Sequence, residues 1–145
     1  MKKTKSNILF QIHRIKTEQF AIIEEHFAPT EPVELLSKIA FKLDRQHQRI
    51  GTFMSFDFHQ NQKVFMKISC SCHFQIEASS WEQLSQSNST ITISKPFLLH
   101  IATITTGTIR GILFCKTEGT SFSNFIIPTI DLTKMVLTDA EFELN

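Results

Sequence analysis

Glycine, cysteine and net charge are all scarce in this chain of 145 residues, and each scarcity excludes a class of function. With four glycines, the chain has no glycine-rich loop to cradle a phosphate group. Three cysteines, an odd number, favour reduced thiols over a framework of disulfide bonds. The formal net charge of +1 argues against nucleic acid as a partner, although it leaves room for a local basic patch.

Tyrosine is absent as well, whereas phenylalanine occurs fourteen times. Phenylalanine offers contact area without a hydroxyl group that needs a hydrogen bond, so it suits a core and an apolar binding surface alike. No apolar run is as long as a membrane span requires. The basic opening "MKKTKSNILFQIHRI" is interrupted by Gln11, His13 and Arg14, unlike a signal peptide. We therefore expect one cytoplasmic domain over residues 1–145, without membrane insertion.

The segment from Lys63 to Glu77 has the clearest secondary-structure pattern. Its apolar and polar side chains alternate with a period of two, which is typical of a half-buried antiparallel strand. Phe65 breaks the alternation, because it is apolar but falls on the polar face. The apolar face holds Val64, Met66, Ile68, Cys70, Cys72, Phe74 and Ile76.

Three segments upstream also have strand patterns. They are Ile8–Glu25, Glu34–Asp44 and Ile50–His59. The polar turn "HQNQ" joins the third of them to the strand from Lys63, which predicts a hairpin. In the first, "RIKTEQ" interrupts the alternation, and a bulge near Lys16–Gln19 would explain the interruption. Four strands with short links predict an antiparallel sheet.

The pattern changes after these strands. A Ser-rich loop with one helical turn at Trp81–Leu84 precedes a predicted helix over Phe97–Glu118. Pro96 falls in the first turn of this helix, and Gly119 is its candidate C-cap. The sequence therefore predicts an α+β fold, in which a four-stranded antiparallel sheet is followed by a long helix packed on or beside it.

Two glycines within the predicted helix, Gly107 and Gly111, are four residues apart and so share one face. Each costs about 1 kcal/mol relative to alanine in a helix interior. A close helix–helix contact, at an interface between subunits, would offset this cost. The alternative is that the helix is irregular at these positions.

Cys70, Cys72 and His73 invite a metal or catalytic interpretation, because thiolate and imidazole bind zinc and act as nucleophile and base. In a strand, however, the two cysteines share the apolar face while His73 points the opposite way. No second pair of ligands has a suitable spacing, and no catalytic motif occurs. We expect no metal, no cofactor and no enzymatic activity, and we keep an enzyme that uses Cys72 or His73 as the less favoured alternative.

Two segments resemble the SecB family of protein-export chaperones. "FQIHRIKTEQF" (Phe10–Phe20) is similar to the first strand of that family. "EGTSFSNFIIPTIDL" (Glu118–Leu132) is similar to the segment after its long helix, with Gly119, Thr120 and Pro128 at matching spacing. The resemblance extends over most of the chain, since the strand from Lys63 falls where the family has its fourth strand.

The resemblance implies a function and an assembly. SecB chaperones hold unfolded or export-competent polypeptides without ATP and without a catalytic site, and they assemble as a tetramer, a dimer of dimers. The long helix would lie between dimers, with Gly107 and Gly111 in contact there. A client would lie in an apolar groove that includes the loop after Gly119, although each apolar loop residue could instead only pin the loop to the core. The implied client-binding residues are Phe122, Phe125, Ile126, Ile127, Phe65 and Phe20.

The docking site for the SecA translocase motor, as the resemblance implies it, departs from the family pattern here. That site uses acidic residues on the outer face of the sheet, and its fourth-strand part corresponds to Phe65 and Lys67. A lysine in place of a carboxylate reverses the sign of the contact, which favours a different partner. Glu18, Glu24 and Glu25 remain as acidic docking candidates on the first strand. One alternative is therefore a SecB-like chaperone for another partner, such as an antitoxin, and a second is a small-ligand-binding or scaffold module.

Overall fold

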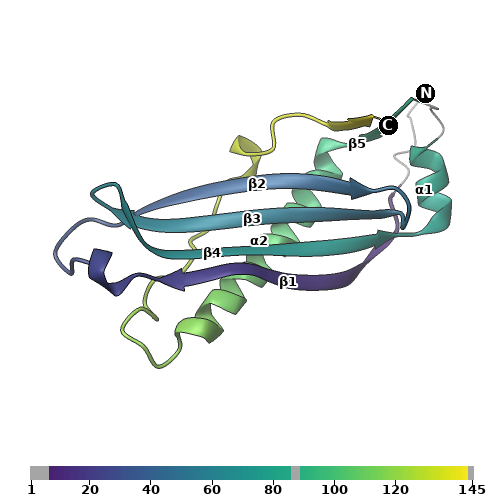
Figure 1. Ribbon diagram of the computed structural model, residues 1–145. Helices are drawn as coiled ribbons and strands as arrows, with labels where there is room; N and C mark the ends of the chain where they lie inside the picture. Colours follow the sequence, from purple (N-terminus) through teal and green to yellow (C-terminus); the bar gives the residue numbers. More distant parts are fainter. Residues whose placement is uncertain (1–6, 86–88, 144–145) are drawn as a thin grey trace.

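A four-stranded antiparallel sheet forms the body of the protein, in the order β1-β4-β3-β2. The structure is a computed structural model that describes residues 7–85 and 89–143. The strands are β1 (Phe10–Ile22), β2 (Glu34–Asp44), β3 (Arg49–Gln60) and β4 (Lys63–Ile76). Tight turns join β2, β3 and β4, whereas the chain leaving β1 crosses to the far edge of the sheet before it enters β2 (Figure 1). The predicted antiparallel sheet is confirmed.

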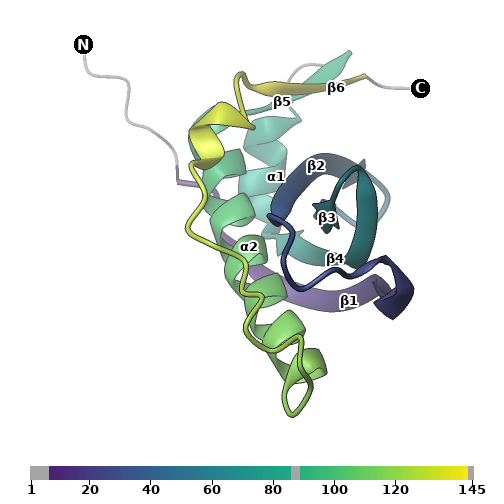
Figure 2. The same cartoon turned by 90° about the vertical axis from the view of Figure 1, so that its left-hand side faces the viewer.

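The long helix α2 (Lys95–Thr117) packs across one face of this sheet, against β3 and β4 (Figure 2). We call this the inner face of the sheet and the opposite one the outer face. In Figure 1 the strands lie in front of α2, so the outer face is turned toward the viewer. A short helix, α1 (Ala78–Leu84), follows β4. The predicted α+β architecture, with a long helix after the sheet, is confirmed.

Two short strands were not predicted. β5 (Thr90–Ile93) pairs with β6 (Ala140–Glu143) in a separate two-stranded antiparallel sheet. The first of these segments was predicted to be part of a Ser-rich loop, because four residues are too few to establish a periodic pattern. Two 3-10 helices, η1 (Glu24–His26) and η2 (Leu132–Lys134), complete the elements within the described residues.

Phe65 is the extra residue of a bulge in β4. Phe58 of β3 pairs with Met66 and the next residue, His59, pairs with Val64, so Phe65 has no partner of its own on β3. A bulge re-aims the side chain at the extra position, and both Phe65 and Met66 are fully buried. The interpretation of Phe65 as an apolar residue on the outer face is therefore wrong. The bulge explains the break in the alternation.

β1 has two irregularities of the same kind, between Ile12 and Arg14 and between Thr17 and Gln19. The second lies where the polar interruption predicted a bulge, and this prediction is confirmed. β1 is an edge strand, and its residues from Gln11 to Gln19 are exposed on both faces. α2 therefore covers the middle of the sheet but leaves the centre of β1 open.

α2 is a regular helix in spite of its many threonines. The hydroxyl groups of five of them donate to the carbonyl oxygen four residues earlier, at 2.7–2.9 Å, so the buried hydroxyls have partners within the helix. Pro96 stands in its first turn and Gly119 follows its end with φ of +80°, as predicted. By length and composition α2 would also qualify as a membrane span, contrary to our expectation, but nine of its side chains are buried within the protein.

Two clusters of buried side chains fill the space between the inner face and α2. The first lies toward α1 and includes Ile50, Phe74 and Trp81. The second includes Phe56, Phe58, Phe65, Phe122 and Ile127. In the second, five aromatic rings meet with centroid distances of 5.0–6.4 Å. We call these five residues the phenylalanine cluster: Phe27, Phe58, Phe65, Phe122 and Phe125.

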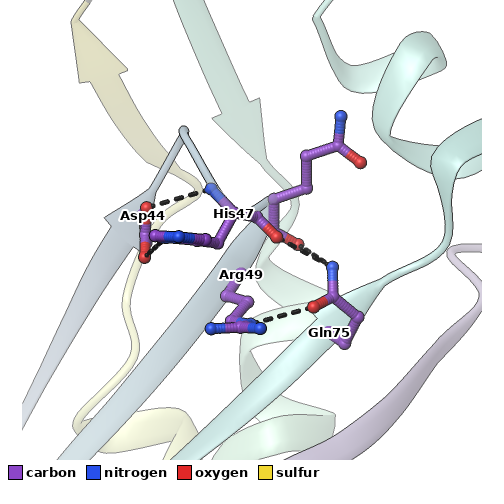
Figure 3. A network of polar contacts seen from close by, with 5 residues as sticks. Asp44, His47, Arg49 and Gln75 are labelled. Atoms are coloured by element: carbon purple, nitrogen blue, oxygen red, sulfur yellow. Dashed lines mark hydrogen bonds and ion pairs between the residues drawn. The ribbon is translucent and has the colours of Figure 1, made fainter.

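Polar contacts close the turn between β2 and β3 (Figure 3). The backbone N–H of His47 donates to Asp44 at 3.1 Å and its ring Nδ1 lies 2.8 Å from the same carboxylate, which lowers the pKa of Asp44. Gln75 of β4 donates to the carbonyl oxygen of His47 and accepts from Nε of Arg49, both at 2.9 Å. These contacts fasten the turn to β4 and engage Arg49.

Candidate functional site

The loop after α2, residues 118–131, is fastened to the helix by Arg110. Its Nε donates to the carbonyl oxygen of Ile127 at 2.7 Å, and its Nη2 donates to that of Pro128 at 2.8 Å. Gly119 begins the loop in the left-handed region, which glycine adopts without steric cost. The loop consequently runs back alongside α2 (Figure 2).

The apolar residues of this loop fall into anchors and exposed residues. Phe122 and Ile127 are buried, and Phe125 is partly buried in the phenylalanine cluster. Ile126 is 59% exposed. Phe122 and Ile127 therefore lie where residues that pin the loop to the core would lie, as the alternative interpretation expected. Ile126 faces solvent.

The side of α2 next to the loop is open. Gly107 and Gly111 are exposed, and a Cβ atom added to either would meet no atom within 4 Å. Phe114, three residues after Gly111, is 52% exposed. Within the described residues, then, no second helix packs against the two glycines, and they form a flat strip beside an exposed aromatic ring.

This strip and the loop enclose a groove of about 340 Å³. Its surface is apolar or backbone except at Arg110, whose guanidinium group already serves the loop carbonyls. Such a groove can accept apolar side chains and an extended backbone, but it presents no nucleophile or acid–base pair. Its lining residues are Gly107, Arg110, Gly111, Phe114, Phe125 and Ile126.

Two separate predictions meet in this groove. Phe125 and Ile126 were predicted to bind a client, and Gly107 and Gly111 were predicted to form a contact between subunits. The structure places all four around one cavity. A client in this cavity would therefore exclude a second subunit from it, and a second subunit would exclude a client.

The remaining predicted client residues lie elsewhere. Phe65 is fully buried beneath the loop and α2, and it cannot contact a client in this conformation. Phe20 is partly buried on β1, where Lys116 of α2 lies 5.3 Å from the centroid of its ring. Neither residue lines the groove. Phe65 does not line the groove because the bulge turns its side chain to the inner face. Phe20 does not line it because β1 lies at the opposite flank of α2.

Glu18, a predicted docking residue, is engaged within the sheet. The hydroxyl of Ser71 donates to Oε1 of Glu18 at 2.7 Å and lies 2.9 Å from Nε2 of His73. Lys16 lies 3.6 Å from the other carboxylate oxygen. The hydrogen bond from Ser71 is the main reason that the pKa of Glu18 is lowered, and burial lowers the pKa of His73. Glu18 therefore serves the packing of β1 on β4.

The other docking candidates do not form one site. Lys67 lies on the outer face, 3.9 Å from Oδ1 of Asp57, a buried oxygen without a hydrogen bond. Phe65 points to the inner face, so it cannot act together with Lys67. Glu24 and Glu25 are exposed, but they belong to η1 and not to the first strand as predicted.

Cys70 and Cys72 lie buried on the inner face, as the alternation predicted, and burial raises the pKa of the Cys70 thiol. His73 stands on the outer face beside Ser71. Within residues 7–85 and 89–143, no three His, Cys, Asp or Glu side chains gather as metal ligands would.

Arg110 and Phe114 were not predicted as site residues. Both lie on the helical face that Gly107 and Gly111 define, since residues at spacings of three and four share a face. Their spacing from the two glycines could therefore have identified both residues from the sequence. The hydrogen bonds from Arg110 to the loop carbonyls were not predictable, because they depend on how the loop folds back.

No family model matches this chain, and no curated protein matches it in sequence. Among solved structures, it is similar to a SecB-like chaperone of Mycobacterium tuberculosis, Rv1957, in complex with a ChAD peptide from the Rv1956 HigA1 antitoxin. The likeness covers 83% of this chain and 90% of that one, with a TM-score of 0.48 and 12% sequence identity.

Proposed function

We propose that the protein is a SecB-like holdase: a non-enzymatic, ATP-independent chaperone that holds unfolded polypeptides in the groove beside α2. The observation that carries the proposal is the groove, which the exposed side chains of Phe114 and Ile126 line together with Gly107 and Gly111. Contiguous exposed apolar surface of this kind marks sites of protein interaction. The resemblance of Phe10–Phe20 and Glu118–Leu132 to the SecB family supports the same function.

The groove is suited to extended chains of varied sequence. Its floor lacks side chains at Gly107 and Gly111, so a client backbone can approach closely. Its walls offer apolar contact that does not depend on a particular client sequence. Full burial of one large apolar side chain contributes about 1.5–3 kcal/mol, so two half-exposed walls supply a few kcal/mol at most. One groove binds weakly, and several grooves on one assembly would hold a long client firmly.

We therefore include a homo-oligomer in the proposal, a tetramer as a dimer of dimers in the cytoplasm. Ile12 and Ile15 on the edge strand β1 support association, because they are 48% and 47% exposed. An open strand edge with apolar side chains is a surface that proteins usually cover. The mass in solution, measured by light scattering, tests this part of the proposal separately.

A pair of variants tests client binding. Ile126→Asp places a carboxylate in the groove, and Leu137→Asp makes the same kind of change at a residue that is 68% exposed but outside the groove. The probe is reduced, carboxymethylated lactalbumin, which stays unfolded, with binding followed by fluorescence anisotropy in the absence of nucleotide. We expect Ile126→Asp to weaken binding about tenfold or more, because a bound client would desolvate the carboxylate and because Arg110 already donates to the loop carbonyls. Leu137→Asp should bind like the unmodified protein.

Both substitutions are at exposed positions, so both variants should keep the thermal stability of the unmodified protein. Failure of the unmodified protein to bind unfolded lactalbumin would overturn the proposal. Equal losses in the two variants would also contradict it. A small molecule that co-purifies in one-to-one ratio and is lost from Ile126→Asp would replace the holdase with a small-ligand-binding module.

A further inference from the structure

The outer face of the sheet carries a grid of side chains in rows, which the strand pairing continues from β2 to β1, with one register shift in β1 between Thr17 and Gln19. Within the described residues, no helix or loop lies over the centre of this face (Figure 1). Three neighbouring rows cross it from β2 through β3 and β4 to β1. The rows are Lys42, Gly51, His73 and Arg14; Ala40, Phe53, Ser71 and Lys16; and Lys38, Ser55, Ser69 and Gln19.

Positive charges stand at both edges of this grid. Lys38 and Lys42 lie on β2, Arg14 and Lys16 lie on β1, and all four are exposed. Lys16 pairs with Glu18, but no carboxylate lies within ion-pair distance of the other three in residues 7–85 and 89–143. Three strand spacings of about 4.8 Å separate the two columns by about 14 Å.

The rows on β3 and β4 hold no carboxylate, lysine or arginine at the centre of the grid, although the carboxylate of Glu18 borders it and accepts from Ser71. A Cβ atom on Gly51 would lie 2.9 Å from Cε2 of Phe53, so the phenyl ring rests directly on the glycine. Nζ of Lys42 lies 4.6 Å from the centroid of this ring, and the ring of His73 meets it at right angles with the centroids 5.5 Å apart. Ser55 and Ser69 continue the floor with small polar groups. The result is a floor between two cationic columns, beside which the Glu18 carboxylate is already engaged by Ser71 and Lys16.

We propose that this outer face docks an acidic segment of a partner polypeptide. The segment runs along the strands over Phe53, and its carboxylates reach Lys38 and Lys42 on one side and Arg14 on the other. A width of about 14 Å accommodates one extended strand or one helix, whose diameter with side chains is about 10–12 Å. The site is separate from the client groove, since α2 and the groove lie on the opposite side of the sheet.

The same cations suit nucleic acid less well. Affinity for nucleic acid comes mainly from many phosphate contacts, whereas this face offers few free cations on a chain of net charge +1. Single strands also need an open aromatic face for base stacking, and Lys42 lies over the ring of Phe53. Charge complementarity therefore favours an acidic polypeptide.

Charge reversal at Lys38 and Lys42 tests the proposal. The variant Lys38→Glu/Lys42→Glu is compared with Lys63→Glu/Lys134→Glu, which changes the net charge equally at exposed positions outside the grid. The probes are a labelled peptide of alternating glutamate and alanine, its glutamine–alanine counterpart, and oligodeoxythymidylate of matched length. We expect the glutamate peptide alone to bind, with an affinity that falls as salt is added. Binding should weaken at least about tenfold in the first variant and less than about threefold in the second.

Binding of an unfolded apolar peptide without acidic residues should be unchanged in Lys38→Glu/Lys42→Glu, which separates this proposal from the proposed function. If the glutamate peptide does not bind, or if the two double variants lose the same affinity, the outer face is not the docking site. Tighter binding of oligodeoxythymidylate than of the glutamate peptide would assign the face to nucleic acid and overturn the proposal. Thermal melts of both variants serve as the folding control, because all four substitutions are at exposed positions.

Discussion

Phe65 and Phe53 lie on neighbouring strands of one sheet but have different surroundings. Phe65 faces inward and is fully buried in the phenylalanine cluster. Phe53 faces outward and is only partly covered, between Lys42 and His73 above Gly51. The inner face thus obtains its stability from packing, and the outer face keeps charged and polar groups available to solvent. The groove lies on the side of the sheet that α2 covers, and the cationic grid lies on the outer face.

Truncation of each ring tests this difference between the two faces. Phe65→Ala should lower the free energy of unfolding by about 3–5 kcal/mol, because it leaves a cavity among four other rings. Phe53→Ala should cost about 1–2 kcal/mol, because much of that ring is already in contact with solvent. Urea denaturation of the two variants measures both values. Equal costs would mean that the outer ring is as well packed as the inner one.

The strands and the long helix were predictable because local periodicity determines them. The alternation of β4 and the stripe of α2 are properties of each segment by itself. The bulge at Phe65 was not predictable, because it depends on how β4 pairs with β3, which the alternation within β4 does not contain. The β5–β6 pair was missed for a related reason, since its two strands are short and far apart in the sequence.

The second test compares Arg110, which fastens the loop to α2, with Arg49 on the outer side of the sheet. Arg110→Met removes the donors for the carbonyl oxygens of Ile127 and Pro128, and we expect a loss of about 2 kcal/mol in stability. The same variant should weaken the binding of unfolded lactalbumin, because the loop no longer holds Ile126 beside α2. Arg49→Met on the outer side removes one bond to Gln75 and should cost about 0.5–1 kcal/mol. A smaller effect at Arg110 than at Arg49 would show that the loop is held by its buried phenylalanines alone.

The candidate site was predictable only in part. An apolar loop after the helix pointed to Phe125 and Ile126, and the glycine spacing pointed to Gly107 and Gly111. The sequence could not predict the meeting of these two pairs of residues in one groove. That meeting requires the chain to reverse at Gly119 and to be fastened by Arg110, and both are consequences of tertiary structure.

Glycine to alanine changes should have opposite signs on the two sides of the sheet. Gly51→Ala places a Cβ atom 2.9 Å from the ring of Phe53 and 3.1 Å from His73, so we expect a loss of about 1 kcal/mol. Gly111→Ala meets no atom within 4 Å and removes a helix-destabilising residue, so it should add about 0.5–1 kcal/mol. Gly111→Ala should nevertheless weaken client binding, because the new methyl group stands on the floor of the groove. Destabilisation by Gly111→Ala would contradict the open groove floor.

The smallest effect concerns the pH dependence of stability on the outer side of the sheet. The pKa of Glu18 is lowered, chiefly by the hydrogen bond from Ser71, so its ionised form stabilises the fold above the ordinary pKa of 4.5. This contribution is lost as the pH falls through the lower pKa of the folded state. The melting temperature of the unmodified protein should therefore exceed that of Glu18→Gln at about pH 6, and the difference should shrink toward about pH 3. In a Ser71→Ala background the main cause of the shift is absent, so Glu18→Gln should change the melting temperature by a nearly constant amount over this range. A shrinking difference that persists without Ser71 would assign the shift to Lys16 instead.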